Sequence, residues 1–223
     1  MRTHDPDLEV QTHPFPARLF HWGIVLAVLV LIGSGWRIYN SSPIFPFRFP
    51  EQFTLGGNVF DALALHNDPG VASAIAWHFA AMWLLLVSYL GFMLWNLLSG
   101  HFRRDFFPIG PRLFLRDFVA AATFRLQHRL GEYNVVQRVA YWTVLFALAM
   151  MLISGVTIWK PVQTYPLELL FGGFQGARLV HFLFMAVIVG FIVVHVALVV
   201  LVPRTFIAMT LGRATARPHG KGS

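Results

Sequence analysis

The chain has 223 residues, of which 57% are hydrophobic and only 12% are charged. Soluble domains carry about 25% charged residues, so this composition excludes an ordinary water-soluble core and predicts a membrane protein. The net charge of +7 does not indicate nucleic-acid binding, because the basic residues lie between apolar runs as topology signals do. The absence of cysteine excludes disulfides, thiolate-bound iron–sulfur clusters and covalent c-type haem.

Four apolar runs are each long enough to cross a membrane, for which about 20 mostly apolar residues suffice. The polar first 17 residues do not have the pattern of a cleavable signal peptide, so we expect the first run to remain as a helix. The sequence therefore predicts an all-α membrane protein, a four-helix transmembrane bundle in a single domain over residues 1–212. A basic tail at 213–223 is expected to be disordered. The predicted spans are 19–36, 75–98, 139–159 and 179–203.

The distribution of basic residues predicts the orientation of this bundle. Four spans place both termini on one side of the membrane. Of the 17 Lys and Arg residues, 13 lie on the side of the termini and 4 on the other side. The excess of positive charge marks the cytoplasmic side, so we expect both termini in the cytoplasm.

The sequence also predicts the structure of two connecting segments. The segment 39–74, rich in Pro, Gly and Phe, is expected to be irregular but packed on the outer side. Residues 111–130 alternate Phe and Leu with Arg at helical spacing. They fit either an amphipathic helix on the inner membrane surface or a solvated connecting helix, and the pattern leaves both open.

Four of the ten histidines lie inside the apolar spans. An ionisable side chain inside a membrane span indicates function by default, although a single histidine can also make a plain interhelical hydrogen bond. The other six lie in tails and loops. The four are His21, His78, His181 and His195.

Depth sorts these histidines into two pairs. His21 and His195 lie near the cytoplasmic ends of their spans, and His78 and His181 lie near the outer ends. The 14 residues from His181 to His195 turn to within about 40° of four full turns and span about 21 Å, so both rings leave one face of the helix. One helix can thus present axial ligands to two stacked haems, and two ligands per iron favour electron transfer over oxygen chemistry.

Other uses of these histidines fit less well. A proton relay would include buried acids, and the four spans have no Asp or Glu. A zinc site needs three or four ligands at one level, whereas these histidines lie at two. The sequence therefore predicts two haems b, one held by His21 and His195 and the other by His78 and His181.

Two arginines and several glycines accompany the histidines. Arg18 and Arg178 each precede a histidine by three residues and share its helical side. They fit either contacts to haem propionates or basic residues that mark the span ends, and both readings stay open. Glycines at five positions could give macrocycles room or serve ordinary helix packing. They are Gly33, Gly35, Gly91, Gly155 and Gly190.

Several segments together resemble a known family. The spacing of His181 and His195 completes a pattern that begins with Arg18-Leu-Phe-His21-Trp22, Trp77-His78-Phe79 and Tyr133-Asn134-Val-Val-Gln137-Arg138. Over about residues 13–212 the chain resembles the di-haem cytochrome b subunits of bacterial nickel–iron hydrogenases, formate dehydrogenases and thiosulfate reductases, and related stand-alone di-haem cytochromes b. The resemblance implies the same two histidine pairs, a place in the bacterial inner membrane, and a periplasmic redox partner.

The resemblance also implies a quinone site near the inner haem. Asn134 and Gln137 match polar residues used there in formate dehydrogenase members. An amide can hydrogen-bond a quinone carbonyl, and Asn134 can equally cap the third helix.

Within this family, two segments indicate the kind of partner. Trp159-Lys160-Pro161-Val162-Gln163 and Gly172-Gly173 are most similar to cytochromes paired with periplasmic molybdopterin oxidoreductases of the sulfite-oxidase type. Many hydrogenase-type members have a fifth helix or a longer outer docking segment, for which only residues 39–74 could serve here.

These observations favour an electron-transfer subunit over an autonomous enzyme. Its electrons would pass between the quinone pool and a periplasmic partner, either a molybdopterin oxidoreductase or a hydrogenase, with no catalytic residues of its own. The alternative is a stand-alone oxidoreductase of the same fold, such as a superoxide:quinone oxidoreductase. A haem-free transporter is disfavoured, because the spans have neither acids nor paired broken helices.

Overall fold

The computed structural model describes residues 9–11, 14–55, 71–100 and 135–215. Within them, four helices are long and apolar enough to cross a membrane. Many of their large apolar side chains are exposed, as Leu26 is at 57%, which suits a lipid surrounding. The predicted four-helix transmembrane fold is confirmed, and the chain is a multi-pass membrane protein. The helices are α1 (Phe15–Ser41), α2 (Val71–Leu98), α5 (Val135–Trp159) and α7 (Gly173–Leu201).

All four helices begin four to six residues before the predicted spans, and α7 ends at Leu201, short of the predicted end at 203. The first begins at Phe15, where proline in the first turn suits a helix start, and continues to Ser41. The last begins at Gly173, after Gly172 adopts a left-handed conformation with φ of 83°. An apolar run locates the lipid-embedded part of a helix, whereas the helix itself continues into polar residues at either end.

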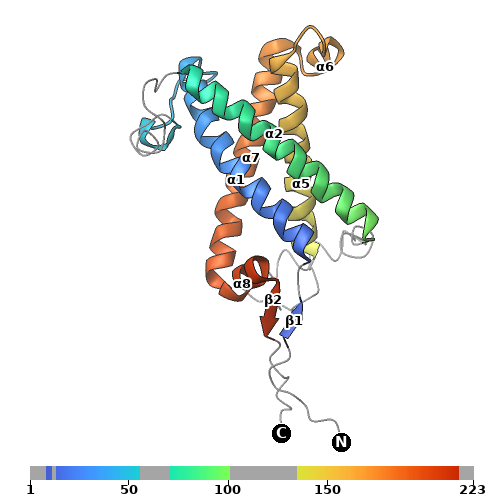
Figure 1. Ribbon diagram of the computed structural model, residues 1–223. Helices are drawn as coiled ribbons and strands as arrows, with labels where there is room; N and C mark the ends of the chain where they lie inside the picture. The colour runs from blue at the N-terminus through green and yellow to red at the C-terminus, as the bar shows by residue number, and fades with distance from the viewer. Residues whose placement is uncertain (1–8, 12–13, 56–70, 101–134, 216–223) are drawn as a thin grey trace, which may run out of the picture.

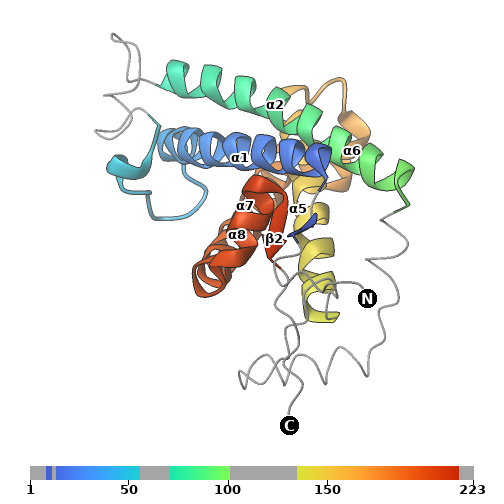
Figure 2. The same ribbon diagram turned by 60° about the horizontal axis from the view of Figure 1, so that its bottom comes forward.

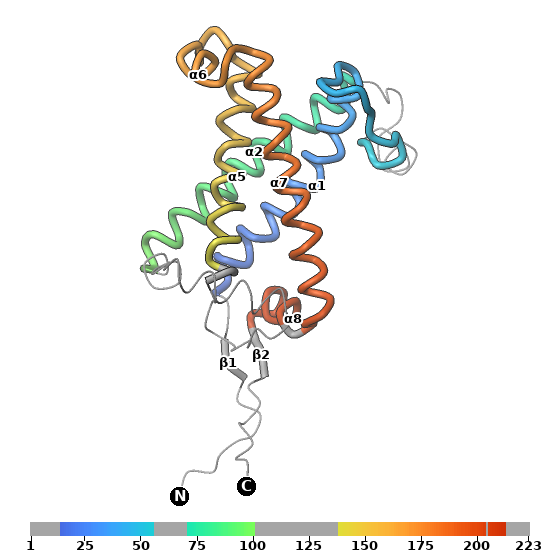
Figure 3. Tube along the Cα trace, turned by 180° about the vertical axis from the view of Figure 1, so that it is seen from behind, coloured from blue at the N-terminus to red at the C-terminus, as the bar shows by residue number. Residues whose placement is uncertain are grey.

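The four helices form two pairs that cross each other. α1 packs along α2, and α5 packs along α7. The α1–α2 pair runs obliquely across the α5–α7 pair (Figures 1 and 2), and the view from behind shows the same crossing (Figure 3). A buried apolar contact between the pairs lies near the middle of the molecule.

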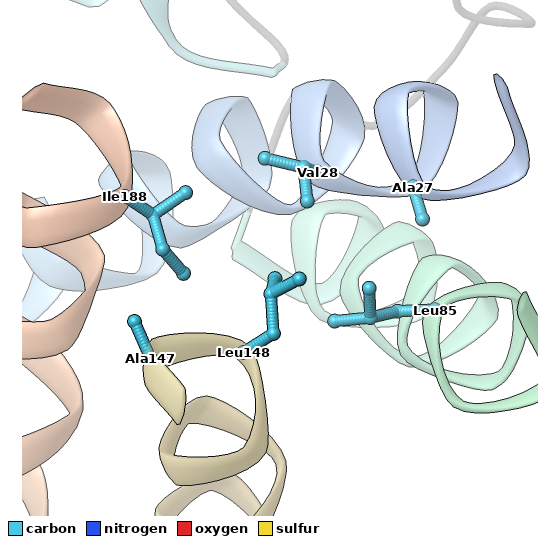
Figure 4. Close-up of a cluster of buried hydrophobic side chains, with 6 residues drawn as sticks. All are labelled: Ala27, Val28, Leu85, Ala147, Leu148 and Ile188. Atoms are coloured by element: carbon cyan, nitrogen blue, oxygen red, sulfur yellow. The ribbon is translucent and has the colours of Figure 1, made fainter. Parts of the chain in front are cut away.

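A cluster of buried apolar side chains fills this crossing (Figure 4). Side chains from all four helices meet there, and the largest contributors are aliphatic. A hydrogen bond from Tyr89 Oη to the Leu145 carbonyl, 3.1 Å long, joins α2 to α5 beside it. The cluster, called the central cluster below, comprises Ala27, Val28, Leu85, Ala147, Leu148 and Ile188.

Short elements mark the two ends of the molecule. The end here called the α6 end carries the short helix α6 (Tyr165–Leu170), as Figure 1 shows. The opposite end, called the α8 end, carries α8 (Pro203–Leu211), which follows a break at Val202.

The α8 end also carries a pair of short strands, β1 (Glu9–Gln11) and β2 (Arg213–Thr215). They are antiparallel, with Val10 opposite Ala214. The expected disorder from residue 213 therefore needs correction over 213–215, where backbone pairing with β1 holds the chain extended. The rest of the tail lies outside the described residues, as does the amphipathic segment 111–130.

The segment after α1 packs back against that helix, and its described part is irregular apart from one short 3-10 helix. Both amide atoms of Asn40 bond the backbone of Phe49, at 2.8 and 2.9 Å. Leu55 N donates to the Gly33 carbonyl at 2.9 Å, beside the 3-10 helix η1 (Glu51–Phe53). Phe182 of α7 packs its ring against aromatic rings of this segment. Residues 56–70 lie outside the described residues.

Candidate metal centres

The structure brings the rings of His78 on α2 and His181 on α7 close together near the α6 end. Their ring centroids are 6.4 Å apart and the rings are tilted by 55°. Both residues lie about two turns from the starts of their helices, which run from that end. The two histidines thus meet where the two helix pairs come together, and their role as ligands of one haem stays a prediction.

His21 of α1 and His195 of α7 form a matching couple nearer the α8 end. Their centroids are 6.3 Å apart with a tilt of 56°, nearly the same geometry as in the first couple. Phe191, one turn before His195, stacks on its ring at 5.5 Å and 12° and so restrains its orientation. Each couple thus takes one histidine from the α1–α2 pair and one from α7.

This spacing fits two imidazoles on opposite sides of one metal ion. A metal–imidazole nitrogen bond is about 2.0–2.1 Å, and the ring centroid lies about 1.1 Å beyond the nitrogen, so opposed rings should be about 6.3 Å apart. Both couples match this value. Among the described residues no group of three or more His, Cys, Asp or Glu could hold a metal ion. The donor set in this part of the chain therefore suits a metal whose remaining ligands come from a macrocycle, as in haem.

Serine hydroxyls contact the far side of both rings in the first couple. Ser34 Oγ of α1 lies 2.9 Å from His78 Nδ1, and Ser154 Oγ of α5 lies 3.0 Å from His181 Nδ1. Sequence reasoning missed both serines. Their one signal is a Ser-Gly dipeptide that recurs in two separate spans.

A glycine follows each of these serines and lies against the same ring. A Cβ atom at Gly35 would lie 3.4 Å from His78 Cε1, and one at Gly155 would lie 3.3 Å from His181 Cε1. These two glycines therefore allow close approach of an imidazole to a neighbouring helix. Gly91 instead accommodates the ring of Phe20, and at Gly190 a Cβ would have no neighbour within 4 Å.

The two predicted arginines bind backbone at the ends of helices. Arg18 Nη1 donates to the Thr210 carbonyl at 2.7 Å, which ties the start of α1 to α8. Arg178 donates to the Ser42 carbonyl and, at 2.9 Å, to Gln175 Oε1. Arg18 lies on the same helix as His21, and Arg178 lies on the same helix as His181. Contact between either arginine and a haem propionate stays a prediction.

The structure describes only part of the predicted quinone site. Asn134 lies outside the described residues. Gln137 lies in the first turn of α5, where the structure describes the backbone and not the side chain. A quinone contact at either residue stays a prediction.

Four membrane helices with a facing pair of imidazoles toward each end define a class of protein that holds haem between its helices. This class is the membrane b-type cytochromes, as the sequence predicts. The chain belongs to the prokaryotic cytochrome b561 family, whose model matches residues 12–212. It is thus a membrane cytochrome of electron transport that binds b-type haem.

Three curated relatives show the range of proteins to which the chain is similar. It is 43% identical over 201 residues to a putative protein-methionine-sulfoxide reductase subunit, YedZ1, of Azospira oryzae, which covers 90% of this chain and 96% of the relative. It is 23% identical to a probable Ni/Fe-hydrogenase B-type cytochrome subunit of Azotobacter vinelandii, over 86% of this chain and 80% of the relative. The corresponding protein of Cupriavidus necator is 24% identical, over 81% and 75%.

Proposed function

We propose that the chain binds two haems b and carries electrons across the membrane between a quinone and a redox partner. His78 and His181 would hold one haem, and His21 and His195 would hold the other. The observation that carries this proposal is the centroid separation of 6.4 and 6.3 Å in the two couples. A haem with two imidazole ligands supplies a one-electron couple and no open coordination position.

The helices hold the two couples in a fixed relation. His181 and His195 lie on one unbroken helix, 14 residues or about 21 Å apart along its axis. Ile188 lies midway between them and is buried in the central cluster. The buried aliphatic side chains and the unbroken helix between the couples suit electron transfer from one side of the membrane to the other.

The proposed orientation places the α8 end in the cytoplasm of a bacterial inner membrane, because the basic residues gather on that side of the chain. The chain contains no cysteine, so a single cysteine at Val162, which is 83% exposed beside α6, can be labelled selectively. A membrane-impermeant maleimide should label it in intact spheroplasts. Labelling only after lysis would reverse the orientation.

The proposed partner is the catalytic subunit of a protein-methionine-sulfoxide reductase on the periplasmic side. The support is the relative that is 43% identical, whose name describes a subunit of such a reductase. A tagged form of this chain should co-purify with that subunit and reduce it when quinol is supplied. Reduction of quinone by superoxide with the purified chain alone would favour the stand-alone enzyme instead.

Haem content tests the ligand assignment. The purified chain should give two haems b per polypeptide in a pyridine haemochrome assay. His78→Ala and His195→Ala should each lower the content to one, whereas His101→Ala, outside the spans, should retain two. One haem or none in the unaltered chain, or two in both ligand variants, contradicts the assignment.

The quinone site is proposed at Gln137, at the start of α5. Gln137→Ala should slow quinol-dependent reduction of the chain and leave its haem spectrum and content unchanged. Normal quinol kinetics would remove Gln137 from the site without affecting the haem assignment.

A further inference from the structure

Each histidine of the His78–His181 couple is contacted by one serine, and the two serines lie on different helices. Ser34 on α1 contacts His78 on α2, and Ser154 on α5 contacts His181 on α7, in each case at Nδ1. Both serines are fully buried, with 0% exposure. The same local arrangement therefore occurs once in each helix pair, on the two sides of one metal position.

Each serine hydroxyl already donates its proton to a backbone carbonyl of its own helix. Ser34 Oγ donates to the Val30 carbonyl at 2.7 Å, and Ser154 Oγ donates to the Met150 carbonyl at 2.6 Å. A carbonyl oxygen only accepts, and a hydroxyl has one proton to give. Each Oγ must then accept a hydrogen bond from the imidazole, so that Nδ1 carries the ring proton.

This count of donors fixes the tautomer of both histidines. With the proton on Nδ1, the lone pair is on Nε2, the nitrogen that must bind the metal between the rings. A ligating histidine that donates its other N–H is held in orientation and becomes a stronger donor to the metal. A stronger donor stabilises ferric over ferrous iron and so lowers the midpoint potential.

We propose that Ser34 and Ser154 are positioning residues that hold His78 and His181 in the metal-binding tautomer and lower the potential of the haem at that couple. This inference rests on the proposed haem ligation. The two serines should change the potential of only one haem, because the hydrogen bonds described above join both of them to the His78–His181 couple and neither to His21 or His195.

Redox titration of the purified holoprotein tests this role. Ser34→Ala and Ser154→Ala should each raise the midpoint potential of one haem, with a larger rise in the double variant. At a fixed ambient potential, each single change should increase the ferrous-to-ferric ratio of that haem about threefold to tenfold, the equivalent of one hydrogen bond. The other haem should keep its potential.

Two comparisons identify the affected haem and the cause. His78→Ala, which should lack the haem at this couple, shows which potential belongs to it. Ser88→Ala removes another buried serine, 5% exposed in α2, and should shift neither potential. Ser34→Thr and Ser154→Thr keep the hydroxyl and should restore the original potential and the low-spin electron paramagnetic resonance signal.

Three results would overturn the proposal. They are unchanged potentials in both alanine variants, an equal shift in Ser88→Ala, or an equal shift in the threonine and alanine variants. Loss of this one haem from an alanine variant and its retention in the threonine variant would support the role. Fewer than two haems in the unaltered chain would contradict the ligation itself, so the two failures are distinguishable.

Discussion

Gly155 lies against the ring of His181, and a side chain placed there tests how closely α5 and α7 must approach. A Cβ at this position would be 3.3 Å from His181 Cε1. Carbon atoms pack best at about 3.5–4.0 Å, so alanine would displace the ring by about 0.2–0.7 Å. The methyl groups of valine lie about one bond, or 1.5 Å, beyond Cβ and can displace the ring further.

The larger displacement caused by valine should exceed what a metal site tolerates, whereas the displacement caused by alanine lies near the limit. A binding group must stay within about 0.5 Å of its productive position. We therefore expect Gly155→Val to lose the haem at His78 and His181, which lowers the pyridine haemochrome value from two to one per chain. Gly155→Ala should be intermediate, with two haems that are more easily lost in detergent.

Gly190 on α7 provides the matched control. A Cβ there would have no neighbour within 4 Å. Nine residues turn a helix through about 900°, so position 190 lies opposite His181, away from the couple. Gly190→Val should retain both haems. Two haems and an unchanged spectrum in Gly155→Val would refute the close packing of His181 on α5.

Two further substitutions test the packing between the helix pairs. Leu148→Ala removes a side chain from the central cluster and should lower the free energy of unfolding by about 2–3 kcal/mol through the cavity left behind. Its thermal midpoint should fall while haem content stays at two, and an unchanged midpoint would show that the cluster is loosely packed. Tyr89→Phe deletes the hydrogen bond to the Leu145 carbonyl and should cost about 1 kcal/mol. A midpoint equal to that of the unaltered chain would show that this bond contributes nothing.

The sequence locates the four spans and brings the same histidines together as the structure does, because both follow from simple geometry; the role of these histidines as ligands stays a prediction. A lipid-embedded helix must be apolar along its length, so composition alone locates it. His181 and His195 share a face because the helical repeat is constant. The depths of His21 and His78 then assign each to its counterpart on α7, and the structure places these rings in contact.

The two serines could not be predicted in the same way. The Ser-Gly dipeptides at 34–35 and 154–155 are visible in the sequence, but their neighbours depend on how each helix is rotated within its pair. That rotation is set by packing over the whole interface, as at the central cluster. Rotation and crossing angle have no local sequence signal in these uniformly apolar helices.

The elements at the α8 end were missed for a different reason. Helix α8 is only nine residues long, and contacts distant in sequence, such as Arg18 to Thr210, hold it against α1. The strands beside it are three residues each and join segments about 200 residues apart. Short elements of this kind owe their form to tertiary contacts, which one sequence does not specify.

The division of every couple between the two helix pairs has a consequence for biogenesis. His21 and His78 are synthesised early, with α1 and α2. The histidines that they pair with, His195 and His181, are synthesised only with α7, the last of the four membrane helices. On the proposed ligation, neither metal position would exist until α7 has inserted, so cofactor insertion would follow translation of nearly the whole chain. A polypeptide truncated before α7 would stay colourless, and colour would report that membrane insertion is complete.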